Sequence, residues 1–372
     1  MRIGIPAEIK SSEFRVGLVP ASVRELAVAG HEILIQSGAG ARIGFSDADY
    51  SAAGGRIVDS ATKAWATELV VKVKEPQSSE FSFLRPDQVL FTYLHLAPDP
   101  QQAEALQRAG SVAIAYETVT DAQGRLPLLA PMSAVAGRMS VQAGAHFLEI
   151  THGGRGVLLG GVPGVAPGRV TVLGAGTVGA HAVRMAVGLG AAVTVIDRSQ
   201  ERLDALDREY RGRIRTLVAS TVAIEESVCR ADLVIGAVLV PGANAPKLIS
   251  RALLKRMQRG AVIVDVAIDQ GGCCETSRPT THNDPVYLEE GVVHYCVANM
   301  PGAVPRTSAL ALNNATLPYV HALADKGWRR ALRDDGGLAA GLNVCAGQIT
   351  HSAVATALDK PYKPAAALIG PN

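Results

Sequence analysis

Residues 169–179 read RVTVLGAGTVG, and this stretch decides how the rest of the chain is interpreted. An apolar strand leads into the glycine turn 174–179, and apolar residues spaced by three and four then predict a helix. The next predicted strand, residues 192–197, ends on Asp197. A strand, a G-x-G-x-x-G turn, a helix and an acidic residue closing the second strand are typical of a βαβ unit that binds a dinucleotide.

Each residue of this unit has a separate physical role. Gly174 permits the tight turn, Gly176 lets backbone N–H groups approach the pyrophosphate, and Gly179 lets helix and strand pack closely. Asp197 would accept hydrogen bonds from the adenine ribose and repel a 2′-phosphate, which favours NAD over NADP. Arg198 next to it weakens this preference.

The chain outside this unit alternates short apolar strands with helical segments, which predicts an α/β protein with largely parallel sheets. The predicted strands are 1–5, 33–36, 69–74, 88–94 and 111–116, followed by 169–173, 192–197, 214–218, 231–239, 261–267 and 292–298. Residues 153–168, GGRGVLLGGVPGVAPG, are either a linker or a surface that other backbone approaches closely. Residues 307–324 predict a helix broken or kinked at Pro318, and the remainder of the chain is expected to be mostly helical.

Composition restricts the class of protein. A chain of 372 residues that is 48% hydrophobic predicts two domains. A net charge of +2 and 4% aromatic residues give no reason to expect a nucleic-acid partner. Because the start lacks a signal-peptide pattern and no stretch is long enough to span a membrane, we expect a cytoplasmic protein. Five cysteines without a C-x-x-C pair predict neither disulfides nor a metal site.

Polar residues follow several of the predicted strands. Lys72 and Lys74 end one strand, while His95, Asp269 and Asn299 each follow another. Ligands of open parallel sheets bind beyond the carboxyl ends of the strands, so these residues are candidates for substrate chemistry. Each of them alone could equally be a solvated or packing residue, and a surface position is the default for Arg15 in the polar turn SSEFR.

The order of several motifs resembles the bacterial alanine dehydrogenases. These motifs are MRIGIPAEIKSSEFRVGLVP, VKVKEP, FTYLHLA, LPLLAPMSAVAGR, GGRGVLLGGVPGV, GAGTVG, DVAIDQGGC, SRPTTH and YCVANMPGAVPRTS. The resemblance implies two Rossmann-like doubly wound parallel-sheet domains, with an NAD domain (129–304) inserted into a catalytic domain (1–128 and 305–372). It also implies a homohexamer.

The resemblance assigns roles to individual residues. It implies that Arg15 and Lys74 bind the substrate carboxylate and that His95 and Asp269 are the acid and base. The implied substrate-pocket residues are Tyr93, Met132, Asn299 and Met300. The implied cofactor contacts are Ser133, Gly174, Gly176, Thr177, Val178, Gly179, Asp197, Arg198, Arg202, Ser220, Val238, Leu239, Ile268, Asp269 and Asn299. Arg202 and the Cys273-Cys274 pair depart from the family pattern.

The implied reaction is NAD-dependent oxidative deamination of L-alanine to pyruvate and ammonium, and its reverse. The substrate nitrogen must lose a proton before hydride leaves the α-carbon, and water must then add, so two proton-handling groups are needed. Two alternatives stay open. One is a related dehydrogenase or cyclodeaminase acting on another amino acid, and the other is a non-catalytic NAD-binding sensor or transhydrogenase-like subunit.

Overall fold

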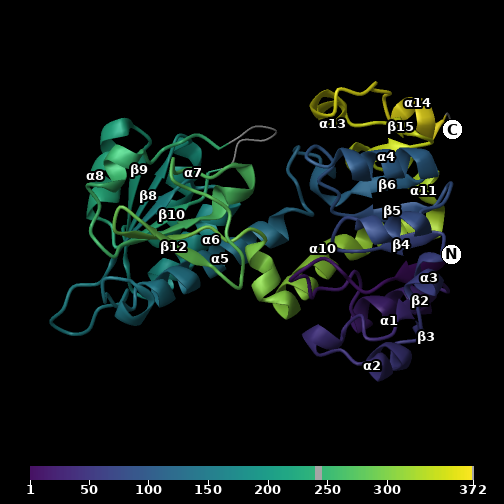
Figure 1. Ribbon diagram of the computed structural model, residues 1–372, viewed down its shortest axis with the longest axis horizontal. Coiled ribbons are helices and arrows are strands. Elements are labelled where there is room, and N and C mark those ends of the chain that lie inside the picture. Colours follow the sequence, from purple (N-terminus) through teal and green to yellow (C-terminus); the bar gives the residue numbers. More distant parts are fainter. Residues whose placement is uncertain (239–244, 371–372) are drawn as a thin grey trace. The chain divides into compact units, whose positions relative to one another are not determined.

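The computed structural model describes residues 1–238 and 245–370, which form two compact units (Figure 1). The first unit contains Met1–Met132 and Val304–Asn372, and the second contains Ser133–Ala303. The second unit is therefore inserted in the sequence of the first. The boundaries implied by the family resemblance lie after residues 128 and 304.

The described part of the first unit contains an eight-stranded sheet with the order β15-β14-β6-β5-β4-β1-β2-β3. Strands β1 to β6 pair in parallel, and β14 and β15 add an antiparallel edge. The strands are β1 (Arg2–Ile5), β2 (Glu32–Gln36), β3 (Arg56–Val58), β4 (Leu69–Val71), β5 (Val89–Thr92), β6 (Val112–Ala115), β14 (Leu342–Cys345) and β15 (Gln348–Ile349). The helices are α1 (Pro20–Val28), η1 (Ala41–Ile43), α2 (Asp47–Ala52), α3 (Ala61–Trp65), η2 (Ser78–Phe83), α4 (Pro100–Ala109), η3 (Tyr116–Thr118), α10 (Pro305–Lys326), α11 (Trp328–Asp334), α12 (Gly336–Ala340), α13 (Ser352–Ala357) and α14 (Ala366–Ile369).

The second unit, as far as it is described, contains a seven-stranded sheet with the order β12-β13-β11-β10-β7-β8-β9. All neighbouring strands are parallel except β12 and β13. The strands are β7 (Arg169–Leu173), β8 (Ala192–Asp197), β9 (Ile214–Val218), β10 (Leu233–Gly236), β11 (Val262–Asp265), β12 (Val286–Glu289) and β13 (Val292–Tyr295). Helix α5 (Ala130–Phe147) runs from the first unit into the second, and the other helices are η4 (Ile150–His152), α6 (Thr177–Gly188), α7 (Gln200–Tyr210), α8 (Thr221–Arg230), α9 (Arg251–Leu254), η5 (Val266–Gln270) and η6 (Met300–Ala303).

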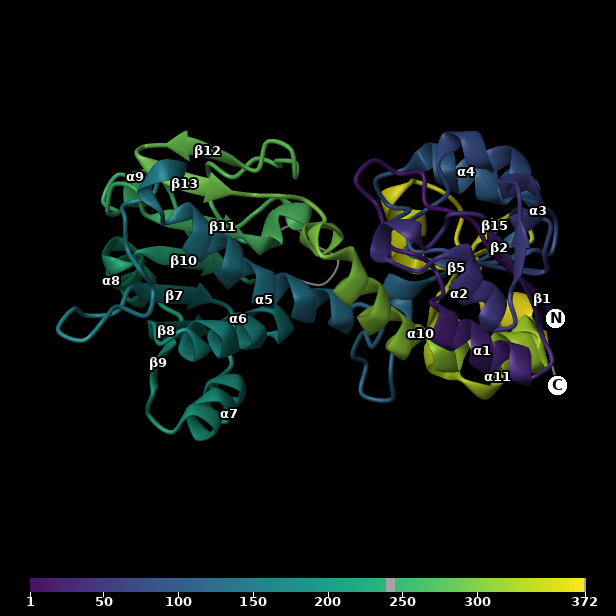
Figure 2. The same cartoon turned by 90° about the horizontal axis from the view of Figure 1, so that it is seen from below.

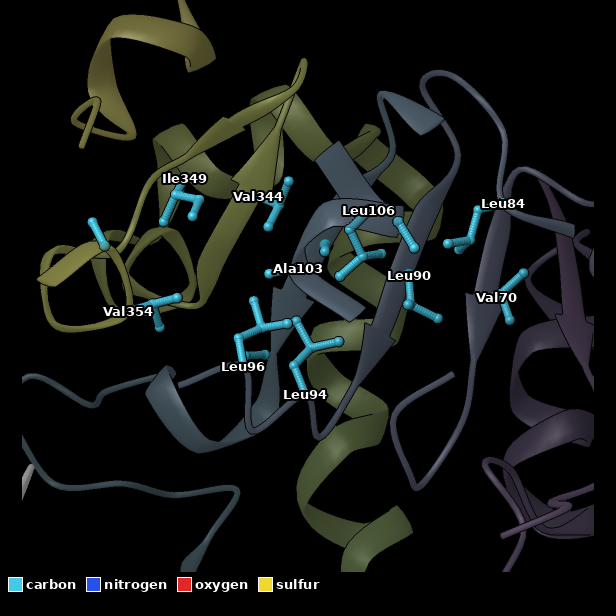
Figure 3. Packing of buried hydrophobic residues seen from close by; sticks show 14 of the residues in the cluster. Val70, Leu84, Leu90, Leu94, Leu96, Ala103, Leu106, Val344, Ile349 and Val354 are labelled. Atoms are coloured by element: carbon cyan, nitrogen blue, oxygen red, sulfur yellow. The ribbon is translucent and has the colours of Figure 1, made fainter. Parts of the chain in front are cut away.

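Apolar side chains from both ends of the sequence form one core in the first unit (Figure 3). Leu90 of β5 and Leu106 of α4 lie in the same cluster as Val344 of β14 and Ile349 of β15. Each of these side chains is removed from water, and burial of such a residue is worth about 1.5–3 kcal/mol. The C-terminal segment therefore returns to the first lobe and completes its core.

A buried ion network lies beside this core. Lys72 follows β4, is fully buried, and lies 3.0 Å from Glu80 Oε1 and 3.2 Å from Glu8 Oε2. Burial would lower the pKa of Lys72, but the two carboxylates outweigh it and raise the pKa. Lys72 is therefore a structural cation, although the sequence made it a candidate for substrate chemistry.

The structure confirms the predicted α/β class and corrects several elements. Strands β3, β12, β14 and β15 were not predicted, and the expectation of a mostly helical end is wrong for β14 and β15. These strands are short or lie at antiparallel edges, where an apolar run is weak. Helix α10 continues through Pro318, so the helix is not broken there. Its buried residues, including Leu312 and Val320, compensate the missing backbone hydrogen bond.

The glycine-rich segment 153–168 has features of both interpretations left open by the sequence. It includes a loop that projects from the second unit (Figure 2), and Val162 and Val165 form a small bridge within it. At Gly154 a Cβ atom would lie 2.2 Å from the Phe147 carbonyl oxygen, so the backbone approach there requires glycine. Across residues 1–238 and 245–370, no helix combines the length and apolar character needed to cross a membrane.

Replacing Lys72 by methionine should lower the free energy of unfolding by about 3–5 kcal/mol, because two buried carboxylates lose their cation. Chemical denaturation would measure the change. Lys63→Met is the matched control, since Lys63 pairs with Asp59 on the exposed surface and an exposed ion pair contributes little to stability. Equal losses in the two variants would contradict a structural role for the Lys72 network.

Candidate functional site

The glycine turn joins β7 to α6 in the second unit. Gly174 has φ +104°, and a Cβ atom there would lie 2.6 Å from the Ala237 carbonyl oxygen. A Cβ atom on Gly179 would lie only 1.8 Å from the Gly174 carbonyl oxygen. Both positions therefore require glycine, one for backbone conformation and one for close packing of helix on turn.

The start of α6 leaves room for an anion. Gly176 is the N-cap residue and offers no side-chain cap, and the nearest atom to an added Cβ is Arg202 Nη1 at 3.8 Å. The unpaired N–H groups and partial positive charge of a helix N-terminus favour phosphate. The turn thus has the shape and electrostatics to hold the pyrophosphate of a dinucleotide.

Asp197, the last residue of β8, stabilises this turn by hydrogen bonds to backbone N–H groups. Its Oδ2 accepts from the Ala175 N–H at 2.5 Å, and its Oδ1 accepts from the Ser199 N–H at 2.7 Å. Arg202 Nη1 lies 4.0 Å from Oδ2. A carboxylate oxygen can accept more than one hydrogen bond, so Asp197 can order the turn and still accept from a ribose hydroxyl.

Arg15 lies in the first unit and is only 2% exposed, so the default surface position was wrong. Glu13 holds its guanidinium in a two-pronged ion pair, with Nε to Oε1 at 2.6 Å and Nη2 to Oε2 at 2.5 Å. The Nη1 group lies 3.0 Å from the Met132 sulfur. Burial would raise the pKa of Glu13, but its hydrogen bonds to Arg15 and the charge of Arg15 outweigh this effect and lower the pKa. The guanidinium is therefore fixed and fully charged.

The positive charge of Arg15 affects the protonation of Lys74. Burial lowers the pKa of Lys74, and the positive charges of Arg15 and Lys10 lower it further. Glu8 accepts hydrogen bonds from the backbone N–H groups of Val73 (2.6 Å) and Lys74 (3.3 Å), which fixes the chain after β4. Two neighbouring cations of this kind are suited to a carboxylate ligand.

His95 follows β5 and belongs to the same unit. Its ring stacks on Tyr93 with centroids 5.8 Å apart and an angle of 5° between the ring planes. Glu117 accepts from the His95 N–H at 2.6 Å, and its Oε1 lies 3.8 Å from Nδ1 of the ring. The backbone of His95 has φ +49°, which is uncommon for a residue with a side chain. The side chain is 48% exposed, so the ring is oriented but accessible to a ligand.

Three further predicted residues lie in the second unit. Asp269 is exposed in η5, directly after β11. Asn299 has φ +59°, and its carbonyl oxygen lies 3.1 Å from Nε2 of His282. Met300 begins η6 and is buried. Both polar residues follow strands of the parallel sheet, as the sequence predicted.

The other predicted cofactor residues occupy varied environments. Ser220 caps α8 by accepting from the Ala223 N–H, Thr177 and Arg198 are exposed, and Ile268 is buried. Ser133, Val178 and Val238 are half-buried. Leu239 lies outside the described residues.

Sequence reasoning missed three carboxylates that hold the candidate residues in place: Glu8, Glu13 and Glu117. Glu117 follows β6, so the search for polar residues at strand ends could have found it. Glu13 stands two residues before Arg15, a spacing that carries no general signal. Glu8 follows β1 after a short interval and could have been included with the strand-end residues.

Comparisons with known proteins agree on the family. The sequence model described as "Alanine dehydrogenase/PNT, N-terminal domain" matches residues 4–136, and "Alanine dehydrogenase/PNT, C-terminal domain" matches residues 140–352. The chain is 59% identical over 371 residues to "Alanine dehydrogenase" of Halomonas elongata, with all of both chains covered. It is 55% identical to "Alanine dehydrogenase" of Mycolicibacterium smegmatis, covering 98% of this chain and 99% of the relative.

Solved structures show the same architecture. A structure named "L-alanine dehydrogenase" matches with a TM-score of 0.95 at 55% identity, covering 96% of this chain and 99% of that one. A transhydrogenase from Sinorhizobium meliloti shares the fold, with a TM-score of 0.83 at 22% identity and coverage of 94% and 100%. The fold and the glycine turn thus define a two-domain α/β protein of the dinucleotide-binding class. The chain belongs to the alanine dehydrogenase/PNT family.

The Lys74 side chain should titrate below its ordinary pKa of about 10.4, because burial and Arg15 disfavour its charged form. Acetylation rates at Lys74, followed by mass spectrometry across pH, would give the midpoint, since only the neutral amine reacts. In Arg15→Met the midpoint should rise, because one neighbouring positive charge is lost. Arg24→Met on the exposed face of α1 is the control. An unchanged midpoint in Arg15→Met would contradict the coupling.

Proposed function

We propose that the chain catalyses the NAD-dependent oxidative deamination of L-alanine to pyruvate and ammonium, and the reverse reductive amination. The observation that carries this proposal is the pair of cations formed by the buried Arg15 and the half-buried Lys74 in a chain of the alanine dehydrogenase/PNT family. Relatives named alanine dehydrogenase that are 52–59% identical along nearly the whole chain support the same reaction.

The carboxylate of alanine or pyruvate binds to Arg15 and Lys74. Charge-assisted hydrogen bonds to a carboxylate are roughly twice as strong as neutral ones. Glu13 fixes the guanidinium before substrate arrives, so little side-chain entropy is lost on binding. The substrate anion also relieves the repulsion between Lys74 and Arg15. The family resemblance assigns the neighbourhood of the small substrate side chain to Tyr93 and Met132 of the first unit and to Asn299 and Met300 of the second.

His95 and Asp269 handle the protons of the reaction. NAD⁺, when bound, supplies the hydride acceptor. One of the two residues removes a proton from the substrate ammonium, and the other activates the water that adds to the resulting iminium. Glu117 orients the imidazole of His95 through its backbone and ring contacts. An imidazole suits this role because its ordinary pKa lies near neutral pH.

The cofactor is held by the second unit. The glycine turn and the start of α6 bind the pyrophosphate, and Asp197 accepts from the adenine ribose. Asp197 disfavours the 2′-phosphate of NADP, while the exposed Arg198 and Arg202 reduce that discrimination. The other cofactor contacts, the catalytic domain boundaries and the homohexamer are those implied by the family resemblance. The cytoplasmic location is the one expected from the sequence, which shows no signal-peptide pattern and no membrane-spanning stretch.

Purified protein should oxidise NADH with pyruvate and ammonium faster than with 2-oxobutyrate or glyoxylate, because the proposed pocket accommodates a methyl group. The decrease in absorbance at the NADH band measures the rate. NADPH in place of NADH should give a lower specificity constant because of Asp197. If activity is highest with a larger amino acid such as ornithine, the proposal that alanine is the substrate is wrong. If no 2-oxo acid is turned over, the protein is better described as a non-catalytic NAD binder.

Replacing either proton-handling residue should lower kcat by about 10²- to 10⁴-fold while NADH binding persists. His95→Ala and Asp269→Asn test this, with NADH affinity measured by fluorescence. His321→Ala on α10 and Asp204→Asn on α7 are the controls, and both should keep normal turnover. A variant at position 95 or 269 with full turnover would remove that residue from the mechanism.

A further inference from the structure

Two histidines and a glutamate gather at the end of α5 in the second unit. His146 stands in the last turn of the helix, Glu149 follows it, and His152 ends η4. One ligand atom from each residue lies within 4.8 Å of the other two. The group is separate from the glycine turn in sequence and from the residues assigned to the reaction.

The backbone holds these three residues in a fixed turn. The Glu149 N–H donates to the His146 carbonyl at 3.2 Å, and the His152 N–H donates to the Glu149 carbonyl at 3.0 Å. Gly153, with φ +86°, ends the turn, and the Gly154 N–H donates back to the Glu149 carbonyl at 3.1 Å. The three side chains are therefore presented from consecutive hydrogen-bonded turns.

The ring of Phe147 packs against both imidazoles. Phe147 is 8% exposed, and its ring lies 5.1 Å from the His146 ring and 5.9 Å from the His152 ring, measured between centroids. The two imidazole centroids are only 3.9 Å apart. The two rings are therefore held side by side, and neutral imidazole is a common ligand of metal ions.

The distances fit a small divalent ion. His152 Nδ1 lies 3.3 Å from Glu149 Oε2, and His146 Nδ1 lies 3.8 Å from Glu149 Oε1. Tetrahedral ligands at about 2.0–2.1 Å from a zinc ion are about 3.3 Å apart. The first pair already has this separation, and the second requires a shift of about half an ångström in exposed side chains. The Thr151 hydroxyl, 3.4 Å from His152 Nδ1, would have to release that nitrogen.

We propose that His146, Glu149 and His152 bind one divalent transition-metal ion of the zinc class, with water completing the coordination. Two imidazoles and one carboxylate suit Zn²⁺, Co²⁺ or Ni²⁺, whereas Mg²⁺ and Ca²⁺ prefer oxygen ligands alone. The cysteines gave no reason to expect a metal site, and the signal in the sequence that points to one is the H-x-x-E-x-x-H spacing of these three residues.

The ion would act as a crosslink between the end of α5 and the turn that follows it. A ligand that binds the folded state and not the unfolded chain stabilises the fold, and the gain rises with the logarithm of the ligand concentration relative to its Kd. The consequence is a metal-dependent increase in the thermal stability of the second unit. The proposal does not depend on the proposed reaction, because none of the three residues is assigned to it.

A second group, His31, His321 and Asp325 in the first unit, has the same donor types. There His31 is already bound on both sides, by Asp325 at 2.7 Å from Nε2 and by the N-terminal amine at 3.4 Å from Nδ1. A metal ion would have to displace one of these partners. This group is therefore the internal comparison for the experiment.

The test uses full-length protein freed of metal by chelation. Calorimetric titration with zinc chloride should reveal one zinc site per chain. In His152→Ala and in Glu149→Gln the zinc affinity should fall at least about ten-fold, because even the loss of a residue that only contacts a ligand can lower metal affinity by that factor. His321→Ala should keep the site. Cobalt in place of zinc should give a visible absorption band in the unmodified protein and in His321→Ala only.

Thermal unfolding gives a second readout that does not need enzyme activity. Zinc should raise the melting temperature of the unmodified protein and of His321→Ala, and leave that of His152→Ala unchanged. Equal zinc affinity in unmodified protein and His152→Ala would overturn the proposal. So would loss of the site in His321→Ala, which would assign the ion to the other group, or the absence of any zinc binding to the unmodified protein.

Discussion

Buried charge is the constraint on which this structure depends. The parallel strands are closed to water, so Arg15 and Lys72, at 2% and 0% exposure, can remain charged only with carboxylates beside them. Glu13 and Glu80 supply that neutralisation, and Glu8 supplies it while also binding the backbone before Lys74. The same groups that make these cations tolerable therefore fix the geometry of the candidate carboxylate site, and stability and ligand binding share residues.

The sequence predicts the fold well where a long apolar run is bounded by glycine residues that form a turn. Strands β7, β8 and β9 have the predicted bounds, and α6 follows the glycine turn as expected. The prediction fails where strand pairing is decided by partners far away in the sequence. Strand β14 pairs with β6, from which it is separated by more than half of the sequence. No local pattern in LNVC predicts which strand it pairs with.

The candidate site is predicted less completely than the fold. Strand-end position was enough to single out Lys74 and His95 in the first unit and Asp269 in the second, because ligands of parallel sheets bind beyond the carboxyl ends of the strands. Arg15 could not be found this way, since a polar turn resembles surface until its ion pair with Glu13 is seen. Glu8, Glu13 and Glu117 orient other residues, but they stand at no regular spacing from those residues in the sequence. Their role is therefore visible only in the structure.

The left-handed backbone of His95 and Asn299 bears on why these residues occupy their positions. A side chain in that conformation costs on the order of 1 kcal/mol, and glycine would avoid the cost. Folding alone would therefore favour glycine at both places. Among the described residues, glycine occupies twenty positions with positive φ, whereas His95 and Asn299 keep an imidazole and a carboxamide at a cost in stability. The same backbone conformation also occurs at Ser12, Asp87, Arg211, Glu290, Ala346 and Asp359. It points to function only at His95 and Asn299, because these two residues also follow parallel strands.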